Sequence, residues 1–102
     1  MAYQWYLVVS EDAQETIDKL SRSNMFLVFS KMIELLYTDN PIDSTQVTDI
    51  KKLKAPEYRG LWRKRAGNWR ILYRIEESKL IYHNVEYKGK LIIQNIVNRR
   101  DL

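Results

Sequence analysis

Cysteine is absent from the 102-residue sequence, and histidine occurs once, as His83. Without cysteine the chain has no disulfide framework and no thiolate metal ligand, and a single histidine cannot form a zinc centre by itself. We therefore predict no metal centre, no metal-dependent catalysis and no cofactor.

Long apolar segments are missing as well. No stretch reaches the ~20 apolar residues that a membrane-spanning helix requires, and residues 1–5 lack the basic start and apolar run of a secretory signal. We therefore expect a cytoplasmic protein without a membrane partner. The chain also has no internal repeat, low-complexity tract or linker, and its length suits one core, so residues 1–102 are predicted to form a single domain.

The charge of the chain is unevenly distributed around a net value of +4. Residues 1–49 hold three Lys or Arg against eight Asp or Glu, a net charge of −5, whereas residues 50–74 hold nine against Glu57 alone, a net charge of +8. This asymmetry predicts that one face of the domain binds an anion. The alternative is that the basic segment docks on the acidic half of the same chain.

The hydropathy pattern predicts the element order β-α-α-β-β-β-β. A first strand at residues 3–9 precedes a helix that is capped by Ser10 and runs to about Arg22. A second helix restarts at Ser23 and ends before Pro41, and we expect its broad apolar stripe to pack into the core. The period then becomes alternating, which predicts strands at residues 58–65, 69–76, 80–87 and 91–97. We expect an α+β fold in which an antiparallel sheet carries the two N-terminal helices on one face.

The pair Gly67-Asn68 between two strands predicts a two-residue hairpin turn, and this turn sets the register of the strands. Arg65 then lies opposite Arg70, and alternation groups four arginines on one face: Arg63, Arg65, Arg70 and Arg74. Facing like charges cost stability, and phosphate binding gives a reason to keep them, because guanidinium groups bind phosphate oxygens bidentately. Neutralisation by Glu76, Glu86 or the acidic half is the alternative.

The segment Gly60–Ile75 resembles the central hairpin of the RelE/ParE toxin superfamily, whose pattern is approximately L-x-R-x-R-x-G-[DN]-[YW]-R-[VIL]-[IVL]-Y. Ile50–Lys54 is similar to the K-L-K-G segment of that family, and Ile96–Leu102 to its closing V-x-H-R-R-D-[VL]-Y. From about residue 50 to the end, the chain resembles the family in its sequence motifs. Before residue 50, it resembles the family only in the order of its helices and strands.

The resemblance implies the toxin of a type II toxin–antitoxin pair. Many members cleave messenger RNA in the ribosomal A site, where the ribose 2′-oxygen attacks the adjacent phosphate, and others inhibit DNA gyrase. For the nuclease branch it implies catalytic contacts to the scissile phosphate from Arg63, Arg65, Arg70 and Arg99, with Arg70 foremost. We expect the neighbouring RNA backbone to be bound by Lys51, Lys52, Lys54, Arg74 and Arg100.

The resemblance also implies a cognate antitoxin in a hetero-oligomer with this chain. An amphipathic helix or an extended strand with acidic residues would then cover the basic face.

Two departures from the family pattern concern proton transfer. Asn98 stands where many members have histidine, and the sequence ends at Leu102, before the usual tyrosine. Arginine, with a pKa above ~12, is a poor proton acceptor near neutral pH. Three alternatives stay open: another group is the base, a further residue follows Leu102, or the protein inhibits gyrase or only binds RNA without cleaving it. Substitutes for the base are His83, Tyr73, Tyr82 and Tyr87, although a structural role is the favoured prediction for each.

Overall fold

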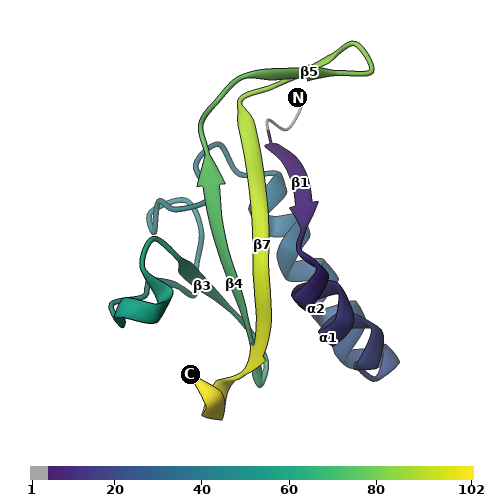
Figure 1. Cartoon of the computed structure of the whole chain (residues 1–102), viewed down its shortest axis with the longest axis vertical. Helices are drawn as coiled ribbons and strands as arrows, with labels where there is room; N and C mark the ends of the chain where they lie inside the picture. The colour runs from purple at the N-terminus through teal and green to yellow at the C-terminus, as the bar shows by residue number, and fades with distance from the viewer. Residues whose placement is uncertain (1–4) are drawn as a thin grey trace.

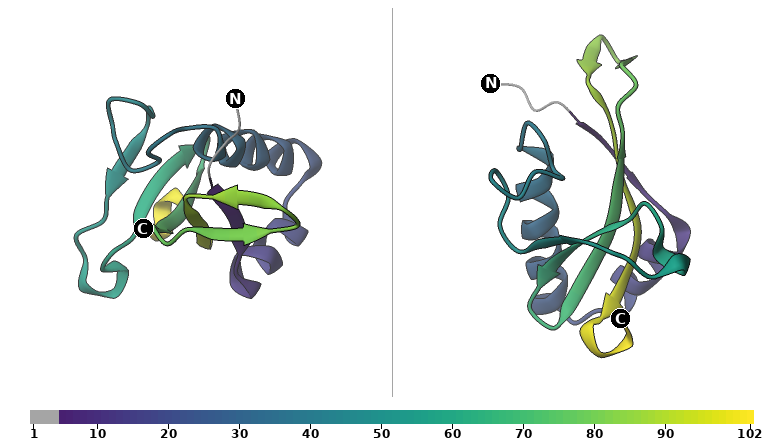
Figure 2. Two further views of the ribbon diagram at one scale, coloured as in Figure 1. Left: turned by 90° about the horizontal axis from the view of Figure 1, so that it is seen from above. Right: turned by 90° about the vertical axis from the view of Figure 1, so that its left-hand side faces the viewer.

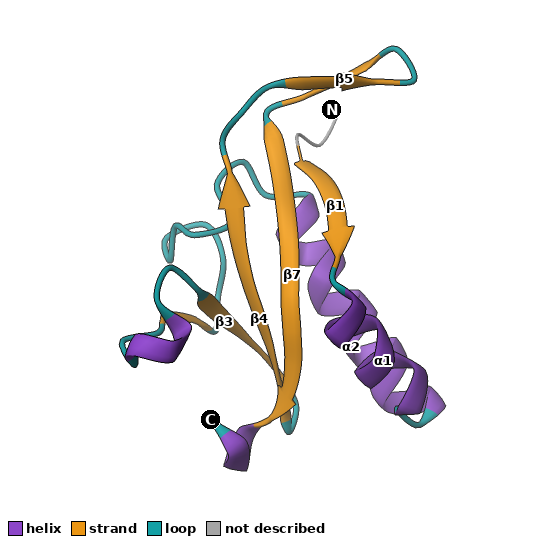
Figure 3. Cartoon of the chain, in the orientation of Figure 1, coloured by secondary structure: helices purple, strands orange, loops and turns teal. Residues whose placement is uncertain are grey.

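A computed structural model describes residues 5–102 and contains a five-stranded sheet, two α-helices and a separate two-stranded hairpin (Figure 1). The helices are α1 (Glu11–Lys19) and α2 (Arg22–Leu36). The strands are β1 (Trp5–Val9), β2 (Ile50–Lys52), β3 (Trp62–Ala66), β4 (Trp69–Glu76), β5 (Leu80–Tyr82), β6 (Val85–Tyr87) and β7 (Gly89–Asn98). Figure 3 also shows two short 3₁₀ helices, η1 (Pro56–Tyr58) and η2 (Arg99–Asp101). Residues 3 and 4 of the predicted first strand lie outside the described residues.

The sheet has the strand order β1-β7-β4-β3-β2. Neighbouring strands are antiparallel except β1 and β7, which are parallel. The predicted α+β class and the two helices after the first strand are confirmed, but the sheet is mixed rather than wholly antiparallel. The reason is that the α1–α2 pair, not a tight turn, follows β1, so β1 can run parallel to its partner.

Serine side chains begin both helices. The Ser10 hydroxyl accepts a hydrogen bond from the Ala13 N–H, as predicted, and the Ser21 hydroxyl accepts one from Asn24 N–H, so α2 begins before the expected Ser23. Helix α2 lies on one side of the sheet (Figure 2). Buried residues of both helices share one core with β1, β3, β4 and β7, formed in part by Ala13, Ile17, Val28, Met32, Leu35, Ile71, Tyr73, Leu91, Ile93 and Ile96. Within residues 5–102, neither helix has the length and apolar character to cross a bilayer.

The strands of the structure differ from the prediction in three places. Residues 80–87 form two strands, because His83 and Asn84 adopt left-handed backbone conformations (φ 50° and 65°) that make a tight turn. The strand expected at residues 58–65 begins only at Trp62, since η1 and Gly60 (φ 83°) precede it. A strand that was not predicted, β2, pairs with β3.

Candidate functional site

The β3–β4 hairpin has the register that its turn predicts. Ala66 pairs with Trp69, Arg65 with Arg70, and Arg63 with Leu72. On one face of β3, the side chains of Lys64 and Ala66 point into the interior and are fully buried. The arginines of the hairpin therefore share the opposite face of the sheet, as the alternation of side chains requires.

The end of β7 brings a further arginine close to Arg63, Arg65 and Arg70. Strand β7 pairs with β4, so that Arg70 lies opposite Val97. One residue beyond β7, the backbone N–H of Arg99 donates to the carbonyl oxygen of Asn68 in the hairpin turn, at 2.8 Å. The C-terminal segment is thus fixed beside the turn (Figure 1). We name Arg63, Arg65, Arg70 and Arg99 the arginine cluster.

Arg70 lies at the centre of the arginine cluster. Its Nη1 donates to the carbonyl oxygens of Gly67 and Trp69, at 2.8 and 2.9 Å, so its guanidinium is held by the turn. Burial lowers the pKa of Arg70, and the charges of the other three arginines lower it further, while Asp49 opposes them. An arginine nevertheless stays protonated near neutral pH. Four positive charges therefore lie close together, around the guanidinium of Arg70, which the turn holds in place.

Within residues 5–102 the arginine cluster forms no salt bridge. Among the described residues, none of its four members has an acidic side chain within salt-bridge distance (4.0 Å). Glu76, one of the expected neutralising groups, binds Arg74 instead, at 2.8 Å. Four guanidinium groups that repel one another and have no salt-bridge partner are a candidate site for an external anion.

The predicted lysines lie next to this cluster. Lys51 of β2 pairs with Arg63 of β3. A hollow of about 290 Å³ is lined by Lys51, Lys52, Leu53, Lys54, Arg63 and Leu102. Arg63 thus belongs both to the arginine cluster and to this hollow, which we call the lysine hollow. The two form one continuous basic surface.

Other residues considered in the sequence lie elsewhere or are occupied. Arg74 is four residues along β4 from Arg70 and is paired with Glu76. Arg100 is exposed in η2, and its N–H donates to the Asn98 side chain at 3.2 Å. Asn98, which the sequence comparison set against a histidine of the RelE/ParE pattern, therefore caps a short helix.

The alternative proton-transfer groups do not reach the arginine cluster. His83 and Tyr82 belong to the β5–β6 hairpin, beyond the opposite end of β4 from the cluster (Figure 1). Tyr82 and Tyr87 pack edge-on against Tyr6, with ring centroids 5.2 and 5.4 Å apart. Tyr73 is fully buried and donates to the Pro41 carbonyl at 2.6 Å, and burial raises its pKa. The three tyrosines have the packing role that the sequence favoured, whereas His83 is exposed in the turn between β5 and β6.

Two residues near the site had no assigned function in the sequence. Lys64 is fully buried, with its Nζ 3.0 Å from Glu34 Oε1 and 2.8 Å from the Thr48 carbonyl oxygen. Asp49 follows Thr48, and its negative charge opposes the lowering of the Arg70 pKa. The signal for Lys64 was a basic residue on the core face of a strand, but its partners come from segments that no local pattern connects.

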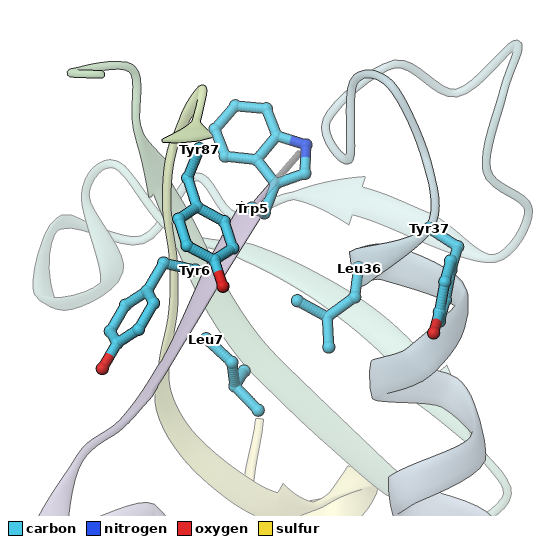
Figure 4. Close-up of a pocket in the computed structure, with 6 residues that line it drawn as sticks. All are labelled: Trp5, Tyr6, Leu7, Leu36, Tyr37 and Tyr87. Carbon is cyan, nitrogen blue, oxygen red and sulfur yellow. The ribbon is translucent and has the colours of Figure 1, made fainter. Parts of the chain in front are cut away.

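A second hollow of about 330 Å³ lies between β1 and the end of α2 (Figure 4). Its lining is mainly aromatic and aliphatic: Trp5, Tyr6, Leu7, Leu36, Tyr37 and Tyr87. Along α2, Phe26, Phe29 and Ile33 are 76%, 41% and 51% exposed. This apolar surface is distinct from the basic one and is typical of protein–protein contacts. Within residues 5–102 no three acidic, histidine or cysteine residues group as metal ligands.

No protein-family model matches the chain, and no curated protein matches it in sequence. Two solved complexes contain chains of similar structure. One is the archaeal RelE–RelB complex from Pyrococcus horikoshii OT3, with a TM-score of 0.60 and 18% identity over 97% of both chains. The other is the RelBE2 toxin–antitoxin complex from Mycobacterium tuberculosis, with a TM-score of 0.56 and 18% identity over 97% of this chain and 100% of that one. The chain therefore shares the α+β fold of chains in these two complexes.

Proposed function

We propose that this protein is the toxin of a type II toxin–antitoxin pair and that it cleaves messenger RNA in the ribosomal A site, which blocks translation in the cytoplasm. The observation that carries the proposal is the arginine cluster, which has no salt bridge within residues 5–102, on a fold shared with chains of two RelE-type complexes. The family resemblance of the hairpin and of the C-terminal segment supports the same function.

The arginine cluster suits the charge that develops in this reaction. The ribose 2′-hydroxyl gives its proton to solvent water as its oxygen attacks the adjacent phosphorus. The new P–O2′ bond then places negative charge on the phosphoryl oxygens until the P–O5′ bond breaks. Preorganised donors stabilise such charge best, because they need no rearrangement as it forms. Arg70, which the turn carbonyls hold in place, fits this description, and Arg63, Arg65 and Arg99 surround it.

The lysine hollow suits the flanking nucleotides. Lys51, Lys52 and Lys54 line one hollow together with Arg63. An ammonium group binds a backbone phosphate, and it can also donate a proton to the departing 5′-oxygen as the P–O5′ bond breaks. The lysines and the arginine cluster would then bind consecutive parts of one RNA strand.

Gyrase inhibition without RNA cleavage is the second candidate function. The observation that favours it is Asn98, which caps η2 at the position where the nuclease motif carries histidine. A protein that only binds gyrase needs no proton acceptor.

Expression in growing bacteria separates the two functions. Primer extension on cellular messenger RNA should show cuts in phase with codons if the protein is a nuclease. Intact messenger RNA together with loss of DNA supercoiling would overturn the nuclease and support gyrase inhibition.

We further propose an antitoxin that covers this chain. Its support is the exposed apolar surface on α2 and at the hollow of Figure 4, together with the two solved complexes, which are toxin–antitoxin complexes. The partner would place apolar side chains on α2 and acidic side chains on the arginine cluster, because these two surfaces lack partners of those kinds within the described chain.

A further inference from the structure

Within residues 5–102, Lys64 is the one charged residue whose side chain is fully buried. It lies on β3 between Arg63 and Arg65, but its side chain points to the opposite face of the sheet. Removing an ammonium group from water is costly, and a buried ion pair rarely adds stability over an apolar side chain of similar size. Its carboxylate partner, Glu34, is 45% exposed, which weakens their attraction further. Stability alone is therefore a poor reason for a lysine here.

The contacts of Lys64 join three separate segments. Its Nζ lies 3.0 Å from Glu34 Oε1 on α2 and donates to the carbonyl of Thr48, at 2.8 Å, in the loop before β2. The next residue, Asp49, has a left-handed backbone (φ 59°), which is uncommon outside glycine and needs support from its surroundings. Its carbonyl accepts a hydrogen bond from Arg65 N–H at 3.0 Å. Lys64 and Arg65 thus both hold the entry to β2.

The segment that is held in this way carries the lysines of the candidate site. Strand β2 has three residues and lies at the edge of the sheet, so few other contacts hold it. It pairs with β3 on one side, and Leu53 N–H then donates to the Leu61 carbonyl at 3.0 Å. A shift of this segment would move the lysines away from Arg63.

We propose that Lys64 is a positioning residue for the RNA-binding surface. Its buried ammonium ties residues 48–54 to β3 and α2, so that the lysines and Arg63 line one hollow. The RNA-binding role of that hollow rests on the proposed function, whereas the tie itself does not. Lys64 touches no RNA in this proposal and acts through the position of Lys51, Lys52 and Lys54.

Amide hydrogen exchange tests the tie without any activity. In Lys64→Met, which keeps the length of the side chain, we expect the Arg65 and Leu53 amides to exchange at least about tenfold faster relative to the β4–β7 ladder. The matched control is Lys31→Met, which removes the other lysine bound to Glu34 and should leave these rates within about twofold. The proposal would be overturned if the Arg65 and Leu53 amides exchanged no faster than in the wild type, or if the amides of the β4–β7 ladder accelerated by the same factor. Should Lys64→Met not fold, Glu34→Gln is measured in the same way.

Coupling between Lys64 and Lys54 tests the consequence for RNA. On ribosomes carrying a defined messenger RNA, Lys54→Ala should lower kcat/KM at least tenfold in the wild-type background and less than twofold in Lys64→Met, because the lysine is already displaced there. Equal losses in the two backgrounds would contradict the proposal. If the wild-type protein does not cleave at all, the proposed function fails, and hydrogen exchange still decides whether Lys64 holds the segment.

Discussion

Arg70 shows how far the sequence determines the candidate site. The Gly67-Asn68 turn sets the register, and the register places Arg65 opposite Arg70, so these positions could be predicted from local residues. Arg99 entered through family resemblance alone, and its position depends on the pairing of β7 with β4. Long-range pairing is not encoded in any short segment, which is also why the Lys64 contacts with Glu34 and Thr48 could not be predicted.

The acid dependence of stability tests the Glu34 contacts. Burial of the Glu34 carboxyl raises its pKa, but hydrogen bonds and charges from Lys64 and Lys31 outweigh burial and hold the pKa below its ordinary value of 4.5. A pKa that is lower in the folded than in the unfolded protein gives stability that is present above pH 4.5 and is lost as the pH falls through the folded-state pKa.

We therefore expect the free energy of unfolding to fall more steeply between pH 5 and pH 3 in the wild type than in Glu34→Gln, by about 0.5 kcal/mol for this half-exposed group. Urea unfolding at several pH values measures the difference. Identical pH profiles would show that the two lysines do not stabilise the Glu34 carboxylate.

At the scale of elements, β4 and the hairpin β3–β4 could be predicted because alternation and a two-residue turn are local signals. The division of residues 80–87 into β5 and β6 was missed, since His83-Asn84 has no glycine to indicate a turn. The direction of β1 was also missed, because a parallel pair depends on the route of the intervening helices.

Gly89 is the glycine on which the sheet depends most. A Cβ added there would lie 1.9 Å from the backbone carbonyl oxygen of Glu76, which cannot move without displacing β4. We expect Gly89→Ala to lower the free energy of unfolding by about 3 kcal/mol, the upper end of the usual cost of overpacking. Thermal and denaturant unfolding measure the loss.

Gly60→Ala provides the control for this substitution. Gly60 has a φ of +83°, and a Cβ there meets no atom within 4 Å, so only backbone strain of about 1–2 kcal/mol is expected. A smaller loss in Gly89→Ala than in Gly60→Ala would show that β4 and β7 approach each other less closely than described.

At the scale of the whole molecule, two surfaces of different character share a small domain. The arginine cluster and the lysine hollow lie where the β3–β4 turn, β2 and the end of β7 meet, and the apolar surface lies on α2 and near β1 (Figures 1 and 4). The uneven charge of the sequence predicted the basic surface, but the second helix was expected to bury its whole stripe. Phe26, Phe29 and Ile33 are exposed instead, because α2 has apolar residues on more sides than the sheet can cover.

Substitutions in the apolar surface of α2 should weaken binding of the proposed antitoxin. Phe29→Ser combined with Ile33→Ser should weaken binding of the protein encoded by the neighbouring gene at least about 100-fold, since each buried apolar side chain contributes about 1.5–3 kcal/mol. Isothermal titration with the purified partner measures it. The exposed Lys19→Ser on α1 is the control and should change affinity less than threefold. An unchanged affinity in the double variant would place the antitoxin elsewhere.

Cleavage of a defined messenger RNA on purified ribosomes tests the nuclease function most directly. The wild-type protein should cut in the A site, and Arg70→Ala should cut at least 100-fold more slowly, a loss of about 2.7 kcal/mol of transition-state stabilisation. Arg22→Ala, at the exposed start of α2, should retain activity within about threefold. Cutting by Arg70→Ala at the wild-type rate, or no cutting by the folded wild-type protein, would contradict the assignment of the arginine cluster to RNA cleavage.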